Sequence, residues 1–192
     1  MKIGIDLDGV VFDSEKEFRI LSEIYDMKEL KQNSKLDNRE VSFQRRFDWT
    51  DEQSEEFFNK NIKWIIENAN VMPGAKRVLK MLKDEGNELI VITARGGKDE
   101  EIIDISQNKI KENGMDIFDK YFYAVKNKAE ICRNEGIDVM IDDTTQNCID
   151  ISNEGIKTLY FRDGASFELA ESNLIKTVYN WGEVYRELGK RD

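Results

Sequence analysis

Short apolar runs that end in polar clusters recur along the chain and predict buried strands. They lie at residues 2–7, 88–93, 121–125, 138–141 and 157–161. Helical patterns lie between the later runs, at residues 74–85, 100–113, 128–135 and 145–153. Strands that alternate with helices in this way predict a doubly wound α/β core, in which helices cover both faces of a parallel, Rossmann-like sheet.

One segment interrupts this alternation. Residues 14–71 are charged, aromatic and helix-like, with no convincing strand, and the chain's only proline, Pro73, follows them. We therefore expect an α/β core formed by residues 1–13 and 72–192, with a small helical cap formed by residues 14–71 inserted after the first strand. A final helix at residues 181–188 is expected to pack back on the core.

The composition is that of a globular protein with a substantial core. The chain has 192 residues, of which 40% are hydrophobic and 35% are charged. No apolar run approaches the roughly 18 residues that a membrane span requires. The first residues are strand-like and carry no signal-peptide pattern. We expect a cytoplasmic protein with no membrane partner.

Charge and missing residue types narrow the chemistry. The formal net charge of −10 disfavours a nucleic-acid polymer as partner, because binding to a phosphate backbone needs clustered Lys and Arg. The chain contains no histidine, which excludes Ser-His-Asp and Cys-His catalysis and the usual zinc sites. The two cysteines are too few for a disulfide framework. Any chemistry must therefore use carboxylates, Lys, Arg, hydroxyls and a hard metal ion.

Candidate site residues follow the ends of four predicted strands. They are Asp6 and Asp8, then Thr93, Ala94 and Arg95, then Lys126 or Lys128, and finally Asp142 and Asp143. Because ligands bind beyond the carboxyl ends of the strands in a doubly wound sheet, we expect these side chains to meet at one edge. Carboxylates held near one another require a cation, and Mg²⁺ prefers oxygen ligands. Asp142, supported by Asp143, is the candidate Mg²⁺ ligand.

These residue types suit phosphoryl transfer, in which an anionic centre needs positioning and charge neutralisation. Asp6 is the candidate nucleophile, which would form an aspartyl-phosphate, and Asp8 is the candidate general acid and base. Thr93 would hydrogen-bond a phosphoryl oxygen, and a lysine would offset the negative charge. Lys128 is favoured over Lys126 for this role because it lies closer to the predicted helix start.

Four motifs resemble, in order and spacing, those of the haloacid dehalogenase superfamily of phosphatases. They are Asp6-Leu7-Asp8-Gly9-Val10, Thr93-Ala94-Arg95, a lysine before a helix, and Ile141-Asp142-Asp143. The resemblance spans nearly the whole chain, and it implies that Asp6 is the nucleophile and Asp8 the acid and base. It also implies that the metal is held by the Asp6 carboxylate, the main-chain carbonyl of Asp8, and Asp142, with Asp143 near the metal.

The helical segment is similar to the cap that this superfamily inserts after its first motif, which usually closes over small-molecule substrates. More narrowly, Met72-Pro73-Gly74-Ala75, the Thr93 motif and the Asp142-Asp143 ending resemble the 5'(3')-deoxyribonucleotidase branch. This resemblance implies a Mg²⁺-dependent phosphomonoesterase whose favoured substrate is a nucleoside or deoxynucleoside 5'-monophosphate.

Substrate contacts are expected from both units. In the core we select Ala94, Arg95 and Gly9, of which Gly9 would permit a tight turn beside the substrate. Several cap aromatics could stack on a base while the others form a small core, and they are Phe43, Phe47, Trp49, Phe57, Phe58 and Trp64. Phe43 and Trp49 are the candidates selected for the stacking role. Arg45 and Arg46 are assigned to a solvated face, with contact to a second anionic group as the alternative.

Other hypotheses fit parts of the pattern. A phosphatase of sugar phosphates or other small phosphoesters would use the same core residues. A receiver-like phospho-acceptor or a non-hydrolysing nucleotide-binding regulator is disfavoured by Asp8, which stands ready to drive hydrolysis. A metal-binding glycosyltransferase leaves Thr93, Lys128 and Asp142 without a shared purpose. The sequence leaves the oligomeric state open, with a homodimer as one alternative.

Overall fold

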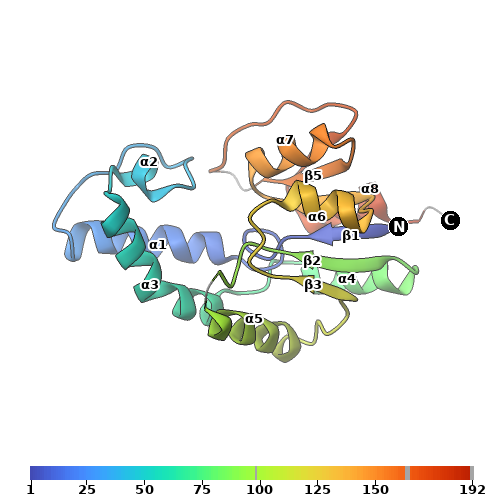
Figure 1. Cartoon of the computed structure of the whole chain (residues 1–192), viewed down its shortest axis with the longest axis horizontal. Helices are drawn as coiled ribbons and strands as arrows, with labels where there is room; N and C mark the ends of the chain where they lie inside the picture. Colours follow the sequence, from blue (N-terminus) through green and yellow to red (C-terminus); the bar gives the residue numbers. More distant parts are fainter. Residues whose placement is uncertain (98, 163–164, 191–192) are drawn as a thin grey trace.

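A parallel sheet forms the centre of the protein (Figure 1). The computed structural model describes residues 1–97, 99–162 and 165–190, and six strands in this part of the chain pair in the order β3-β2-β1-β4-β5-β6. All of their pairings are parallel. The strands are β1 (Lys2–Ile5), β2 (Glu88–Ile92), β3 (Lys120–Phe122), β4 (Val139–Asp142), β5 (Lys157–Phe161) and β6 (Ile175–Val178). The predicted α/β fold class is thus confirmed.

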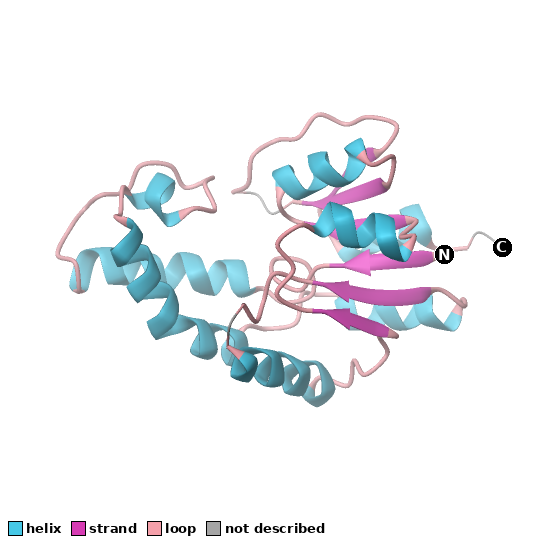
Figure 2. Cartoon of the chain, in the orientation of Figure 1, coloured by secondary structure: helices cyan, strands magenta, loops and turns pink. Residues whose placement is uncertain are grey.

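Helices cover both faces of this sheet (Figure 2). They are α4 (Ala75–Asp84), α5 (Glu100–Glu112), α6 (Lys128–Glu135), α7 (Thr145–Asn153) and α8 (Trp181–Leu188). Successive side chains of a strand point to opposite faces of the sheet. Ile3 and Ile5 belong to the larger cluster with residues of α4 and α8, whereas Ile90 and Met140 belong to a second cluster with residues of α6 and α7. Two apolar layers therefore hold the sheet rigidly.

The sixth strand, β6, was not predicted from the sequence. Its sequence Ile-Lys-Thr-Val has only two buried residues, at its two ends, because it lies at the edge of the sheet beside β5. The third strand is also shorter than predicted. It ends at Phe122, and Ala124 adopts a left-handed backbone conformation with φ 55° that stops the extended run.

The inserted segment forms a helical unit beside the sheet, and we call residues 14–71 the cap. It contains α1 (Ser14–Lys28), α2 (Phe43–Phe47) and α3 (Asp51–Asn68), which lie apart from the sheet in Figure 1. The chain enters and leaves the cap at adjacent points. Asp13 N donates to Asn70 O at 2.8 Å, and Met72 N donates to Val11 O at 2.8 Å. These two hydrogen bonds hold the entering and leaving segments together, and α1 begins directly after the loop that follows β1.

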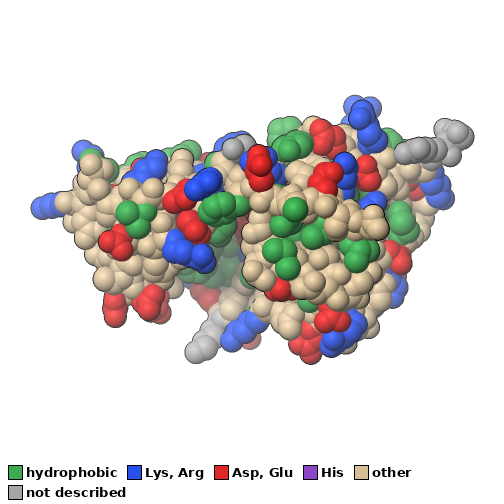
Figure 3. Space-filling view, turned by 90° about the horizontal axis from the view of Figure 1, so that it is seen from above, with side chains coloured by type: hydrophobic (Ala, Val, Ile, Leu, Met, Phe, Trp, Pro, Cys, Tyr) green, Lys and Arg blue, Asp and Glu red, His purple; other side chains and the backbone are tan. Residues whose placement is uncertain are grey.

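The cap rests on the core at two places. On one side α3 packs along α5, where Ile62 and Ile66 contact Ile102, and Lys63 pairs with Glu101. On the other side the guanidinium of Arg39 lies 4.8 Å from the centre of the Phe167 ring. The surface between the two units is hollowed, with apolar side chains inside the hollow (Figure 3). None of the helices in the described part of the chain has the length and apolarity needed to cross a bilayer.

Candidate active site

The order of the strands brings three distant parts of the chain to one edge of the sheet. β1 lies between β2 and β4, so Asp6 after β1, Thr93 after β2 and Asp142 at the end of β4 are neighbours. Lys128 joins them because it is the first residue of α6, whose start is fixed by Asn127. The Asn127 side chain accepts a hydrogen bond from Glu130 N at 3.1 Å.

Asp6, Thr93 and Lys128 lie at the wall of a cavity of about 830 Å³ between the cap and the core, whereas Asp142 is fully buried and is not part of the lining. Core residues in its lining include Asp6, Asp8, Thr93, Lys128 and Asp143. This volume suits a small-molecule ligand. The predicted strand-end residues are thus brought together at one cavity.

A buried lysine connects two of the acids. The Lys128 ammonium lies 2.9 Å from Asp6 Oδ2 and 2.6 Å from Asp142 Oδ2, and its side chain is 6% exposed. Burial alone would lower the pKa of Lys128, but Asp142 and Asp6 raise it above its ordinary value. Lys126 is exposed at the rim of the cavity. The lysine that reaches the acids is therefore Lys128, as favoured from its position before the helix.

Asp6 is the least satisfied of the buried acids. Its Oδ1 atom has no hydrogen-bond partner among the described residues, although Oδ2 accepts from Lys128. Burial raises the pKa of Asp6 to about 6, Lys128 opposes this rise, and Asp142 adds to it. An unpartnered buried carboxylate oxygen needs a further positive or hydrogen-bonding group.

Asp142 and Asp143, the acidic pair at the end of β4, lie in different environments. The Asp142 carboxylate accepts hydrogen bonds from Lys128, from Thr144 N at 2.9 Å and from Asn147 Nδ2 at 3.0 Å. Asp143 accepts only a long hydrogen bond, from Thr144 Oγ1 at 3.4 Å, within the described residues. Burial, followed by Asp142 and Asp6, raises the pKa of Asp143 well above its ordinary value. Asp143 therefore needs a cation more than Asp142 does.

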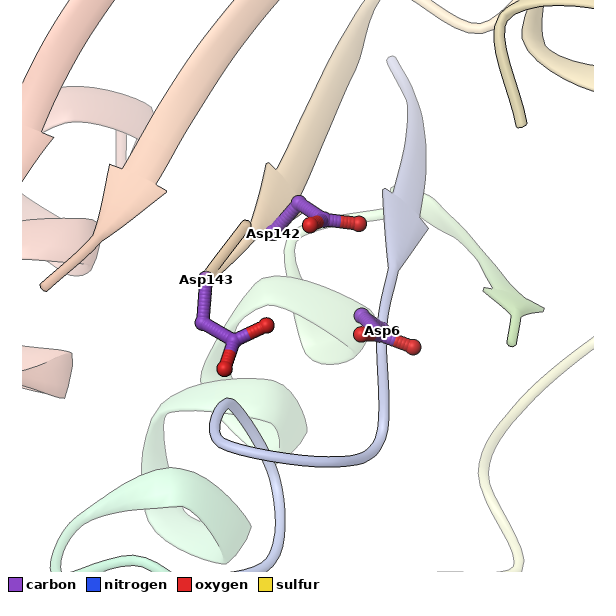
Figure 4. A group of neighbouring side chains, drawn as sticks. All are labelled: Asp6, Asp142 and Asp143. Carbon is purple, nitrogen blue, oxygen red and sulfur yellow. The ribbon is translucent and has the colours of Figure 1, made fainter. Parts of the chain in front are cut away.

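Three carboxylates are close enough to hold one metal ion (Figure 4). Oxygen atoms of Asp6, Asp142 and Asp143 all lie within 4.8 Å of one another. The unpartnered Asp6 Oδ1 and the weakly bonded Asp143 fit a hard divalent cation. Such an ion needs oxygen ligands, and its charge neutralises the carboxylates. The contacts favour Asp143 as a direct ligand and give Asp142 the role of fixing Lys128. This division differs from the expectation that Asp143 merely supports Asp142.

Gly9 lies beside the acidic cluster and does not line the cavity. It has φ +68°, and a Cβ atom built on it would lie 2.0 Å from Asp143 Oδ2. Any other residue would therefore clash with this carboxylate and also occupy a strained backbone conformation. Gly9 is not among the residues that line the cavity. The structure thus places it beside Asp143 rather than at the predicted substrate position.

Asp8 is bound by an arginine through both of its oxygens. Arg95 Nε donates to Asp8 Oδ2 at 2.8 Å, and Arg95 Nη2 donates to Asp8 Oδ1 at 2.6 Å. The Ser14 hydroxyl also donates to Asp8 Oδ1. Burial opposes ionisation, but Arg95 and then Ser14 hold the pKa of Asp8 below its ordinary value. An ionised Asp8 matches the state required to take a proton from water.

The predicted residues that follow β2 also reach the cavity. Thr93 is fully buried at the cavity wall, and its Oγ1 accepts a hydrogen bond from Arg95 N at 3.3 Å. Ala94 and Arg95 belong to the same lining. Arg95 was selected as a substrate contact, but in this structure its guanidinium is paired with Asp8.

The two aromatic candidates of the cap stack on each other, with ring centres 5.4 Å apart, but only one of them lines the cavity. Phe43 lines the cavity. Trp49 is 3% exposed and packs in the cap core with Tyr25, Phe47 and Phe57, while its Nε1 donates to Asp26 at 2.8 Å. The structure thus corrects the placement of Trp49, whose indole is taken up by contacts within the cap.

Several cavity residues were not selected from the sequence. They include Glu15, Phe18, Ile62 and Asn147, whereas Phe58, which also lines the cavity, was among the aromatics considered for stacking. Asn147 had a usable signal, because it lies in the first turn of α7 just after the second acidic pair. Glu15 had none, since its position depends on the buried Arg46, whose Nη2 lies 3.1 Å from Glu15 Oε1. Arg46 itself is 1% exposed, so its assignment to a solvated face was wrong.

Solved structures with this fold are known. A haloacid dehalogenase-like family hydrolase from Streptococcus pneumoniae superposes with a TM-score of 0.71 at 20% sequence identity, covering 97% of each chain. The fold is that of haloacid dehalogenase-like hydrolases. A haloacid dehalogenase phosphatase from Thermococcus onnurineus has a TM-score of 0.62 at 18% identity, with 98% of each chain covered.

A further similar structure comes from Haemophilus somnus and is described as a predicted phosphoglycolate phosphatase. Its TM-score is 0.66 at 17% identity, with 97% of this chain and 96% of that chain covered. No protein-family model matches the sequence, and no curated protein sequence matches it. Likeness at these identities establishes the shared fold, and the chemistry must be argued from the site.

Proposed function

We propose that the protein is a divalent-cation-dependent phosphomonoesterase that acts through an aspartyl-phosphate on Asp6. The observation that supports this proposal most directly is the setting of Asp6. Its carboxylate lies at the cavity wall with one oxygen paired to Lys128 and the other unpartnered, and Asp8 and Thr93 line the same cavity. This arrangement suits attack on a phosphorus atom whose charge is neutralised by its surroundings.

The reaction would occur in two halves. In the first, an Asp6 oxygen attacks phosphorus, the bond from phosphorus to the leaving oxygen breaks, and Asp8 gives that oxygen a proton. In the second, water attacks the aspartyl-phosphate, Asp8 takes a proton from the water, and the bond from phosphorus to Asp6 breaks. Inorganic phosphate leaves, and the starting forms of both aspartates return. Thr93 and Lys128 would bind and neutralise the phosphoryl group throughout.

Asp8 must change its protonation state during this cycle. Arg95 favours its ionised form, which suits the activation of water. The negative charge of a bound phosphate favours protonation of a nearby carboxylate, which is the state that the first half requires. The bound phosphate therefore favours the protonated Asp8 of the first half, and Arg95 favours the ionised Asp8 of the second half.

Mg²⁺ is the cation that fits the proposal, because it binds oxygen ligands and commonly accompanies phosphoryl groups. Asp6 and Asp143 would hold it. When bound, it would neutralise charge on the phosphoryl oxygens.

A nucleoside or deoxynucleoside 5'-monophosphate is the favoured substrate. The acidic end of the cavity would hold the phosphate, and its cap side carries the aromatic residues Phe18, Phe43 and Phe58. Phe18 and Phe58 are stacked, with an interplanar angle of 10° and ring centres 6.2 Å apart. Aromatic side chains of this kind provide stacking surfaces for a planar base.

A phosphate-release screen with Mg²⁺ tests both parts of the proposal. It should cover nucleotides, sugar phosphates and other small phosphoesters, with the Asp6→Asn protein as the blank. We expect release that requires Mg²⁺ and is fastest with nucleoside 5'-monophosphates. Equal rates across nucleotides together with faster release from sugar phosphates would overturn the nucleotide assignment. Release by the Asp6→Asn protein would overturn the mechanism.

Two exposed aromatic residues of α3 provide a matched pair for the substrate assignment. Phe58 is 41% exposed and lines the cavity, whereas Trp64 is 48% exposed and is not part of the lining. Loss of base stacking removes about 1–3 kcal/mol, so Phe58→Ala should raise KM for a nucleoside 5'-monophosphate about tenfold. Trp64→Ala should leave KM unchanged. Equal effects of the two substitutions would contradict stacking at Phe58.

A further inference from the structure

The pair formed by Asp8 and Arg95 joins two loops at the edge of the sheet. Asp8 follows β1, and Arg95 follows β2, which is the neighbouring strand. The guanidinium is presented side-on, so that Nε and Nη2 each bind one carboxylate oxygen, at 2.8 Å and 2.6 Å. The Arg95 side chain is 2% exposed, while that of Asp8 is 33% exposed. The carboxylate therefore remains accessible while its partner does not.

Arg95 is itself fixed from three directions. Its backbone N donates to Thr93 Oγ1 at 3.3 Å, and its backbone O accepts from Ala124 N at 2.6 Å, in the loop after β3. Its guanidinium carbon lies 5.3 Å from the centre of the Phe12 ring. Arg95 thus ties together the loops after β1, β2 and β3, and its side chain has little freedom to leave Asp8.

We propose that Arg95 is the positioning residue for Asp8, holding its carboxylate in one orientation at the cavity by a two-point contact. This inference deepens the proposed function and rests on it, because Asp8 is the group that would move the proton. Arg95 contributes by acting through Asp8, to which its guanidinium is bonded.

The chemistry of arginine explains why this residue suits the task. A bidentate contact fixes both the position and the plane of a carboxylate, whereas the ammonium of a lysine acts as a single point charge. Arg95 Nη1 has no hydrogen-bond partner among the described residues, so the hydrogen bonds of the guanidinium all go to Asp8. A small error in the placement of a catalytic group can lower turnover about 10²-fold. A lysine here would keep the charge and lose the orientation.

A double-mutant cycle tests this inference with Arg95→Lys and Asp8→Asn, alone and combined. Turnover of p-nitrophenyl phosphate gives kcat, and competition by inorganic phosphate gives the affinity for the phosphoryl group. We expect Arg95→Lys to lower kcat at least tenfold and to change phosphate affinity less than twofold. In the Asp8→Asn protein, the same change should lower kcat less than twofold, because the residue it positions is already gone.

Arg133→Lys is a matched control, since Arg133 also pairs with a carboxylate, that of Glu154, but lies on the surface. If Arg95→Lys does not fold, Arg95→Gln replaces it in the same cycle, because it too removes the two-point contact with Asp8. An equal loss of kcat with and without Asp8 would overturn the inference, as would a loss confined to phosphate affinity. Wild-type turnover that is absent from the Asp6→Asn protein supports the proposed function separately, so the two failures are distinguishable.

Discussion

Two buried aspartates, one in the cap and one at the edge of the sheet, are held in opposite ways. Asp26 is 2% exposed, and its carboxylate accepts hydrogen bonds from Ser34 N, Ser34 Oγ and Trp49 Nε1 at 3.0, 2.5 and 2.8 Å. Asp6 is 5% exposed, and one of its oxygens accepts from Lys128 while the other has no partner within the described residues.

The difference is the one expected between a structural acid and a candidate reactive one. Neutral donors of the cap satisfy Asp26 completely, so it stabilises the cap and leaves nothing for a ligand to complete. Asp6 is buried beside other acids with an unpartnered oxygen, which is the environment expected of a functional group. Replacement of Asp26 should therefore affect stability, and replacement of Asp6 should affect turnover.

Lys128→Met is expected to have the largest effect, because it removes the cation between Asp6 and Asp142. We expect turnover to fall about 10²–10³-fold, as when a charge-stabilising donor is lost. The free energy of unfolding should fall by about 3 kcal/mol, because an uncompensated buried charge remains. Phosphate release and urea unfolding measure the two effects.

The loss of stability in Lys128→Met should also depend on pH. Without the lysine, the folded-state pKa of Asp6 rises further above the ordinary value of 3.8, so the folded protein binds more protons than the unfolded one. Stability is then retained at low pH and lost as pH rises through the folded pKa. Lys120→Met, at an exposed ion pair, is the control and should change neither turnover nor this pH dependence. A destabilisation that is equal at all pH values would contradict the assignment of Lys128 as the cation that stabilises ionised Asp6.

Asp26→Ala should destabilise the protein by about 2–3 kcal/mol, because it leaves the buried Trp49 Nε1 and the Ser34 donors unpartnered. Turnover at a temperature where the protein is folded should stay within about threefold of the wild-type value. Urea unfolding and phosphate release measure the two effects. A large loss of turnover in a stable Asp26→Ala protein would break the comparison between the two acids.

Gly9→Ala should have a smaller effect on stability, about 1–2 kcal/mol from the left-handed backbone, and should also weaken binding of Mg²⁺. The added Cβ atom would meet Asp143 Oδ2 at 2.0 Å. Gly86→Ala is a matched control, because Gly86 has φ +86° and nothing lies within 4 Å of its added Cβ atom. Both should lower the urea midpoint, and only Gly9→Ala should raise the Mg²⁺ concentration needed for half-maximal phosphate release.

The site residues that could be predicted best from the sequence are those whose positions follow from the topology of the sheet. Asp6, Thr93 and Lys128 could be placed together because parallel strands end at a common edge and helices start there. The edge strand β6 escaped prediction because only two of its residues are buried. The parallel strand ends and the helix starts at one edge thus account for the placement of Asp6, Thr93 and Lys128.

Side-chain directions could not be predicted in the same way. The sequence does not distinguish the two cap aromatics, and only packing shows that Phe43 lines the cavity while Trp49 is bonded to Asp26. Likewise Asp142 and Asp143 are adjacent in sequence, and only the contacts of Lys128, Thr144 and Asn147 show which one is already satisfied.

Acid quenching during turnover, followed by mass mapping of phosphorylated peptides, tests the central claim most directly. The wild-type protein with Mg²⁺ and a phosphomonoester should carry one phosphoryl group on Asp6, and hydroxylamine should remove it because an acyl phosphate is the linkage. The Asp6→Asn protein should carry none and release no phosphate. Phosphate release by the Asp6→Asn protein, or a phosphoryl group on another residue, would contradict the account.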